Sequence, residues 1–92
     1  MVYIRVTRGR FSSANTDEAV RMARDQLVPA LKQRPGFRNY HAGLNHDAGT
    51  LIAISTWDTR EQAQAAQTAR GPFESLGIRF EAAEIFEVTV EA

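Results

Sequence analysis

The sequence contains no cysteine, only two histidines and no long apolar run among its 92 residues. Without cysteine, the chain has no disulfide framework, no thiol nucleophile and no cysteine-ligated zinc site. The lack of a long apolar run predicts neither a signal peptide nor a segment that spans a membrane. We therefore expect a cytoplasmic protein that does not act at a membrane.

An excess of charge of one sign is also missing. Eleven basic and eleven acidic residues cancel, and a concentrated basic surface is what nucleic acid requires, so we expect no nucleic-acid partner. The glycines are too widely spaced for a phosphate-binding loop, and no serine nucleophile motif occurs. His41 and His46 form no helical pair of metal ligands. The sequence therefore predicts no metal site.

At this length we expect the chain to form one domain, residues 1–92. A domain of this size buries a modest fraction of its surface and is marginal as a monomer, which favours an oligomer.

Alternation of apolar and polar residues predicts four strands, and helical spacing predicts two helices. We expect strands over residues 2–10, 37–44, 50–57 and 80–90, with a turn over 45–49 joining the middle pair into a hairpin.

The first helix is expected to begin with a capping box of Asn15 and Glu18 and to run to about Gln33. Pro29 lies inside it and should kink the helix or tighten its last turn.

The second helix is expected to be capped by Asp58 or Thr59 and to end at Gly71-Pro72. Its apolar face is thin because it consists of alanines: Ala63, Ala66 and Ala69.

The order β-α-β-β-α-β predicts a ferredoxin-like α+β fold, an antiparallel sheet with both helices on one face. On the last strand, Phe80 and Phe86 share one parity, and Ile85 has the other. Because both faces of the sheet then carry apolar residues, the uncovered face needs a second cover. We expect a homodimer in which two sheets pack face to face.

Trp57 is the only tryptophan and lies where the third strand gives way to the second helix. Its ring could form the wall of a pocket and donate the indole N–H to a ligand, or it could be an ordinary core residue at the corner.

Three segments together resemble the antibiotic biosynthesis monooxygenase superfamily: Pro35-Gly36-Phe37, the strand over 50–57, and the junction over 57–63. That resemblance implies a dimeric α+β barrel, a cleft between sheet and helices, and a tryptophan at the position of Trp57. Some members of the superfamily oxidise phenolic or anthrone polyketides with dioxygen and no cofactor, others oxidise small quinols, some degrade haem, and many have no known activity. For this chain the resemblance favours cofactor-independent oxidation of a small hydrophobic aromatic compound, such as a quinol, phenol or anthrone. Haem-degrading members carry an asparagine on the first strand and a histidine on the second helix, and this chain has neither, so no cofactor is expected.

Such oxidation needs a proton acceptor and a group that stabilises the substrate anion. His41 is the candidate base, with Asn39 on the same side of its strand; otherwise His41 is a half-exposed or interface residue. Arg5 is the candidate for holding an anionic oxygen, flanked by Tyr3 and Thr7. The alternative for Arg5 is a salt bridge with Glu84 or Glu87.

Tyr40 and Phe37 are predicted to face opposite sides of the sheet, and His46 to be a solvated turn residue.

Two other functions remain open. The same fold could serve as a non-catalytic dimeric binding or stress-response module, because so few catalytic groups are present. It could also carry a muconolactone-isomerase-like activity, which needs an acid–base group near the substrate.

Overall fold

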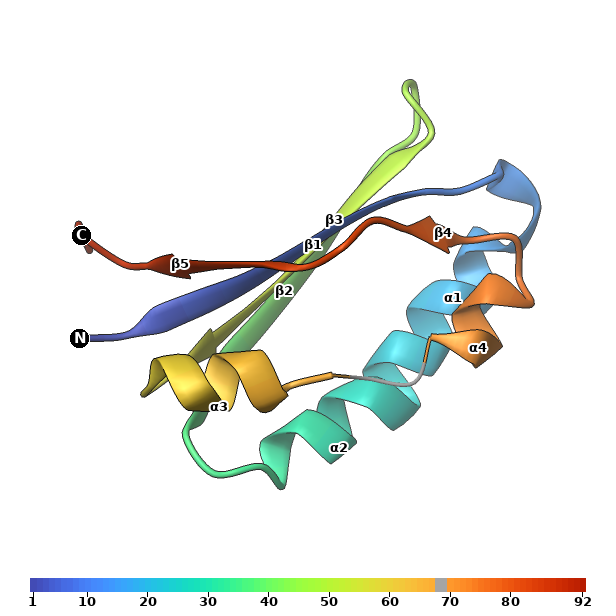
Figure 1. Ribbon diagram of the computed structural model, residues 1–92. Helices are drawn as coiled ribbons and strands as arrows, with labels where there is room; N and C mark the ends of the chain where they lie inside the picture. Colours follow the sequence, from blue (N-terminus) through green and yellow to red (C-terminus); the bar gives the residue numbers. More distant parts are fainter. Residues whose placement is uncertain (68–69) are drawn as a thin grey trace.

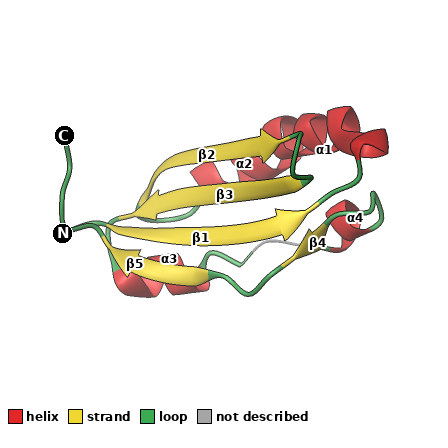
Figure 2. Ribbon diagram, turned by 90° about the horizontal axis from the view of Figure 1, so that it is seen from above, coloured by secondary structure: helices red, strands yellow, loops and turns green. Residues whose placement is uncertain are grey.

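The computed structural model describes residues 1–67 and 70–92 and contains one antiparallel sheet with helices on one side (Figures 1 and 2). The strands are β1 (Tyr3–Arg10), β2 (Phe37–Asn45), β3 (Thr50–Trp57), β4 (Arg79–Phe80) and β5 (Glu84–Glu87). They are arranged in the order β2-β3-β1-β4, and β5 also pairs with β1. The two short strands β4 and β5 together occupy the place of the fourth strand of a ferredoxin-like sheet. The predicted fold class is confirmed.

The helical segments cover one face of this sheet, and the other face is open (Figure 2). They are η1 (Ser13–Asn15), α1 (Thr16–Met22), η2 (Ala23–Leu27), α2 (Val28–Lys32), α3 (Arg60–Ala65) and α4 (Gly71–Glu74).

The expected capping box at the start of the first helix is not formed. Asn15 makes no capping hydrogen bond to the helix. Its side-chain Nδ2 instead donates to the Leu76 carbonyl at 3.2 Å. The side chain therefore ties the start of the first helix to the turn that follows α4.

The turn before Pro29 is widened, so the expected tightening of the last turn is wrong. In η2, a π-helical segment, the Val28 N–H donates to the Ala23 carbonyl, five residues back. Pro29 then lies in the first turn of α2, where a residue without an N–H leaves no helical bond unmade.

A bulge at the start of β2 brings two aromatic residues to the same face. Phe37 pairs with Trp57, but Asn39 pairs with Thr56, so the register shifts by one residue between them. Phe37 and Tyr40 both pack against the buried core as a result. The prediction that they face opposite sides is wrong, because strict alternation does not hold across a bulge.

The hairpin turn has the predicted form. The Gly49 N–H donates to the Asn45 carbonyl at 2.9 Å, and Asn45 Oδ1 accepts from the Ala48 N–H at 3.1 Å. Gly49 has φ of 69°, a left-handed conformation that glycine adopts without strain. His46 is exposed in this turn, edge-on to the Phe11 ring.

Thr59, not Asp58, caps the second helix, in a capping box with Gln62. This helix, α3, ends at Ala65, well before the predicted end, and Gly71-Pro72 begins α4 instead. Ala63 and Ala66 are buried as predicted. Ala69 lies outside the described residues.

The last strand is split, and the split changes which face its residues occupy. Phe80 on β4 pairs with Gly9, while Phe86 on β5 pairs with Ile4. The two registers differ by one residue, so Phe80 faces the helices and Phe86 faces the open side. The prediction that the two rings share a face is therefore wrong.

The buried core lies between the sheet and the helices at the end nearest α3. It consists of Leu31, Trp57, Ala63 and Ala66. Tyr3, Leu27 and Ile85 pack against it.

Candidate functional site

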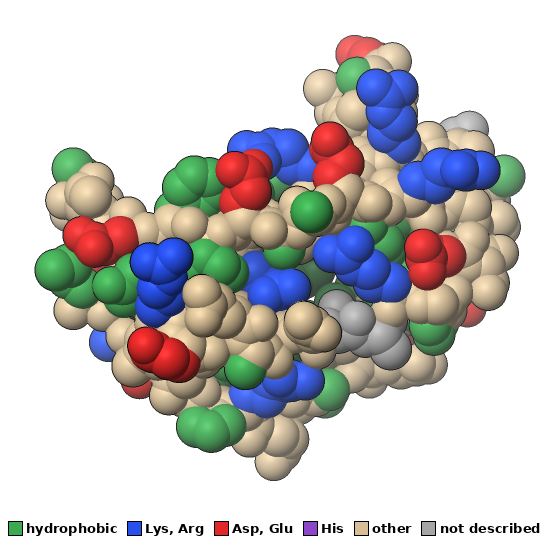
Figure 3. All heavy atoms as spheres, in the orientation of Figure 1, with side chains coloured by type: hydrophobic (Ala, Val, Ile, Leu, Met, Phe, Trp, Pro, Cys, Tyr) green, Lys and Arg blue, Asp and Glu red, His purple; other side chains and the backbone are tan. Residues whose placement is uncertain are grey.

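A cavity of about 600 Å³ lies between the helix-facing side of the sheet and the helices. This volume falls within the range typical of small-molecule sites. Its floor comes from the middle of β1, β2 and β3. Its walls come from α1, η2 and α2 on one side and, on the other, from Ala66, Gln67, Arg70, Phe73, Ile78 and Phe80. Figure 3 shows Lys and Arg side chains beside a hollow on this side of the molecule.

The lining is mainly apolar, with a few polar groups. The apolar side chains include Ala19, Val20, Ala23, Leu27, Val28, Leu31, Ala42, Leu44, Leu51, Ala53, Phe73, Ile78 and Phe80. The uncharged polar side chains are Thr7, Tyr40, Ser55 and Gln67, and the charged ones are Arg5, Arg24 and Arg70. Within residues 1–67 and 70–92, no histidine, aspartate or glutamate lines the cavity.

Arg5 reaches from β1 to the carboxyl-terminal end of α3. Its Nη1 donates to the Ala63 carbonyl at 3.0 Å and to the Gln64 carbonyl at 3.2 Å. Both carbonyls belong to the last turn of α3, where a cation is favoured. The Ala63 carbonyl also accepts from the Ala66 N–H at 3.4 Å. Burial, followed by the charges of Arg70 and Arg34, lowers the pKa of Arg5.

The alternative interpretation of Arg5, a salt bridge to a glutamate of the last strand, is wrong. Arg8 makes the ion pair with Glu84, at 2.8 Å. Arg8 and Glu84 lie on the open side of the sheet, whereas Arg5 points to the helices, because neighbouring residues of a strand face opposite sides. Arg5 therefore remains a cation of the cavity.

Tyr40 presents a hydroxyl to the cavity. Burial raises the pKa of its phenol, so the group stays protonated at neutral pH and can donate a hydrogen bond. Within the described part of the chain, the hydroxyl has no hydrogen-bond partner, which leaves it for a ligand.

Trp57 does not line the cavity, because it is a core residue with only 1% of its surface exposed. Its Nε1–H donates to Ser55 Oγ at 2.8 Å, and its ring meets Phe37 edge-on, with centroids 5.5 Å apart. The indole adjoins the cavity through Ser55 and Leu31, which line it. Trp57 thus sets the position of Ser55 at the cavity floor.

The candidate residues of the first strand lie on the helix side. Arg5 and Thr7 line the cavity. Tyr3 pairs with Trp57 and packs against the core cluster, so it does not reach the cavity.

His41 and Asn39 lie on the opposite side of the sheet. His41 pairs with Ile54 and Asn39 with Thr56, and both are exposed. The bulge after Phe37 fixes this parity. The sheet thus separates His41 from the cavity, so a ligand bound there could not use it as a base.

Sequence reasoning did not single out Arg24, Arg70, Phe73 and Phe80 as lining residues. Arg70 and Phe73 flank Gly71-Pro72, which the sequence marks only as the end of a helix. Tyr40 was expected only on the face opposite Phe37, and the bulge turns it to the same, helix-covered face. No signal in the sequence indicates that bulge.

No cluster of three or more His, Cys, Asp or Glu side chains occurs within the described ranges. Nor is any helix in those ranges both long and apolar enough to cross a membrane.

No protein-family model matches the sequence, and no curated protein matches it. Solved structures do match. SnoaB, a cofactor-independent oxygenase from Streptomyces nogalater, is 17% identical with a TM-score of 0.70, covering 98% of this chain and 95% of that one.

Two further solved structures are similar over their length. The monooxygenase from the gene ActVA-Orf6 of Streptomyces coelicolor, in complex with nanaomycin D, is 14% identical with a TM-score of 0.71, covering 98% and 88% of the two chains. A dimeric ferredoxin-like protein from an uncultured marine organism is 14% identical with a TM-score of 0.67, covering 99% and 98%. At these identities the similarity shows a shared fold.

Proposed function

We propose that this chain, which has the fold of the antibiotic biosynthesis monooxygenase superfamily, is a cofactor-independent monooxygenase-like protein that oxidises a small hydrophobic aromatic compound. The cavity between sheet and helices is the observation that carries the proposal. Its volume and apolar walls suit a flat ring system. Its few polar groups lie where they could orient that ring.

The side chains of the cavity support stabilisation of an anion better than removal of a proton. The described lining offers no imidazole or carboxylate as a general base. The guanidinium of Arg5 and the protonated phenol of Tyr40 can both stabilise negative charge on a substrate oxygen. A substrate with an acidic phenol or anthrone would lose its proton to water, because these groups lower its pKa in the cavity.

The anion would then transfer an electron to dioxygen. For an anthrone, one oxygen atom enters the ring carbon as a carbonyl, and the other leaves as water with the two hydrogens of the original CH₂ group. The substrate supplies the electrons, and the protein supplies orientation and stabilisation of the anion.

Oxygen uptake tests this proposal. The purified protein, treated with a metal chelator, is expected to consume dioxygen with at least one member of a panel of hydroquinones and anthrones. The uptake rate should exceed the rate in buffer at least about tenfold, a modest part of what positioning and electrostatic stabilisation can supply. Uptake equal to buffer across the panel would contradict the proposal.

A homodimer through the open sheet face is part of the same proposal. That face carries apolar side chains that no helix covers: Ile4, Ile52, Ile54 and Phe86. Phe86 is 41% exposed. A second copy of the sheet is the simplest cover for such a face. His41 and Asn39 would then lie at the interface.

A non-catalytic binding module is the second candidate, favoured by the lack of a general base in the described lining. It predicts that aromatic ligands bind in the cavity while oxygen uptake stays at the rate in buffer. An isomerase has less support, because acid–base chemistry would there fall to Tyr40 alone.

A further inference from the structure

The cavity carries positive charge that no acidic side chain of its described lining balances. Arg24 pairs with Asp25 at 3.1 Å and is 68% exposed, so its charge is largely screened by solvent. Arg5 and Arg70 form no ion pair within residues 1–67 and 70–92. The cavity therefore holds two guanidinium groups without an acidic partner in a lining that is mainly apolar.

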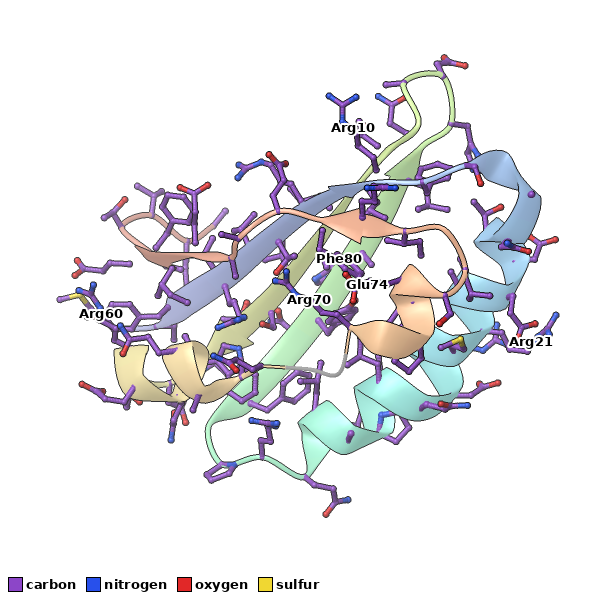
Figure 4. The ribbon with its side chains drawn as sticks, turned by 45° about the vertical axis from the view of Figure 1, so that its right-hand side comes forward. Arg10, Arg21, Arg60, Arg70, Glu74 and Phe80 are labelled. Atoms are coloured by element: carbon purple, nitrogen blue, oxygen red, sulfur yellow. The ribbon has the colours of Figure 1, made fainter. Side chains whose placement is uncertain are left out.

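Arg70 is supported by an aromatic platform. Its guanidinium carbon lies 5.2 Å from the centroid of the Phe80 ring, and Phe80 meets Phe73 edge-on with centroids 6.2 Å apart. Figure 4 shows Arg70 and Phe80 between β4 and α4, with Glu74 nearby. A stacked guanidinium keeps its N–H groups free at the edge of its plane. Arg70 is thus oriented without using up its donors.

Arg5 also has donors to spare. A single nitrogen, Nη1, makes both bonds to the α3 carbonyls. In the part of the chain that the structure describes, Nε and Nη2 make no hydrogen bond. A guanidinium binds a carboxylate most strongly through two parallel N–H groups. Arg5 can therefore keep its place on α3 and still receive an anion.

Arg5 and Arg70 line the same cavity. After burial, the charge of Arg70 is the main cause of the lowered pKa of Arg5, followed by Arg34. Two like charges in a half-buried site repel each other, and an anion between them replaces that repulsion with attraction to both. Arg34 differs from them because it is exposed, does not line this cavity and is engaged with the Ala65 and Gln67 carbonyls.

We propose that the cavity selects an aromatic compound that carries a carboxylate, with the carboxylate held between Arg5 and Arg70. This inference rests on the proposed function, since it names the substrate class of the same site. A carboxylate neutralises one of the two positive charges. The remaining charge stabilises the oxyanion that forms when the ring is oxidised. A neutral quinol would leave the two cations unbalanced.

Binding of a matched ligand pair tests the inference. Titration calorimetry at pH 7 compares 1-hydroxy-2-naphthoate with 1-naphthol, which differ by the carboxylate alone. We expect the acid to bind at least about tenfold more tightly, because charge-assisted hydrogen bonds to a half-buried pair of guanidiniums exceed 1.4 kcal/mol. Added salt should narrow this preference. Equal or tighter binding of 1-naphthol would overturn the inference.

Two arginine variants locate the site. Arg70→Gln should reduce the preference for the acid to below about threefold, since the paired attraction is lost. Arg34→Gln, which removes a nearby cation outside the cavity, should retain it. Circular dichroism checks that both variants fold. A preference unchanged by Arg70→Gln, or abolished equally by both substitutions, would also overturn the inference.

The outcomes separate this inference from the proposed function, because the binding measurement needs no turnover. A retained preference for the acid without oxygen uptake on any substrate contradicts the oxidation alone. Uptake that is equally fast with quinols that carry or lack a carboxylate contradicts the carboxylate selectivity alone.

Discussion

Replacing Trp57 with alanine is expected to lower the free energy of unfolding by about 3–5 kcal/mol, the usual effect of truncating a buried aromatic residue. Trp57 is the largest fully buried side chain, and it joins β3 to α3 and to the Phe37 ring. In a domain this small, such a loss is a large part of the total stability. Chemical denaturation followed by circular dichroism measures it, because the variant has no tryptophan fluorescence.

Ser55→Ala provides the matched control. It keeps the ring but removes the acceptor of the indole N–H, and a buried donor left without a partner costs about 1–3 kcal/mol. We therefore expect a smaller loss than for Trp57→Ala. A loss below about 1 kcal/mol in Trp57→Ala would contradict the assignment of Trp57 to the core.

Phe86→Asp is expected to convert the proposed dimer to a monomer. The substitution would place a carboxylate from each copy in the proposed contact between two sheets, and an unpaired buried charge costs several kcal/mol. Since each 1.4 kcal/mol changes an equilibrium constant tenfold, the dissociation constant should rise at least about a hundredfold. Analytical ultracentrifugation over a range of concentrations measures this change.

Ala30→Asp controls for added charge. Ala30 is exposed on α2, and α2 lies on the side of the sheet opposite its open face (Figure 1). The Ala30→Asp variant should therefore keep the oligomeric state of the wild type. A wild-type protein that is monomeric at every concentration would contradict the proposed dimer. So would a Phe86→Asp variant that dissociates no more readily than Ala30→Asp.

The sequence predicts the fold well because local patterns carry it. Alternation of apolar and polar residues places β1 and β3 within a residue of their observed ends. The residues around Trp57 resemble a known superfamily, and that resemblance indicates the β-α-β-β-α-β order as well. The Thr59 capping box was one of the two caps expected, and Asn45 with Gly49 accounts for the hairpin turn. Each of these features depends on residues close together in the chain.

The site could not be predicted as well, because it depends on two one-residue shifts. The bulge after Phe37 turns Tyr40 toward the helices, which keeps His41 on the open face. The register change between β4 and β5 separates Phe80 from Phe86. Neither shift has a marker such as glycine in the sequence. The pairing partner on the neighbouring strand decides both.

The sequence also could not predict that Arg70 lines the cavity, and the reason is physical. Its neighbours Gly71 and Pro72 look like the end of a helix, and in the structure they begin α4. Its stacking partner, Phe80, lies ten residues further along the chain and across a turn. Only tertiary packing brings this cation to the same cavity as Arg5.

Oxygen uptake by a variant with a filled cavity tests the central claim most directly. Ala53 lies on the cavity floor, and Ala53→Phe should fill part of the space a substrate needs, at a stability cost of about 1–3 kcal/mol. The matched control, Ala48→Phe, places the same ring in the exposed hairpin turn. We predict that uptake with the best substrate of the panel falls to the rate in buffer in Ala53→Phe and stays at the wild-type rate in Ala48→Phe. Wild-type uptake by a folded Ala53→Phe variant would contradict the assignment of the reaction to this cavity.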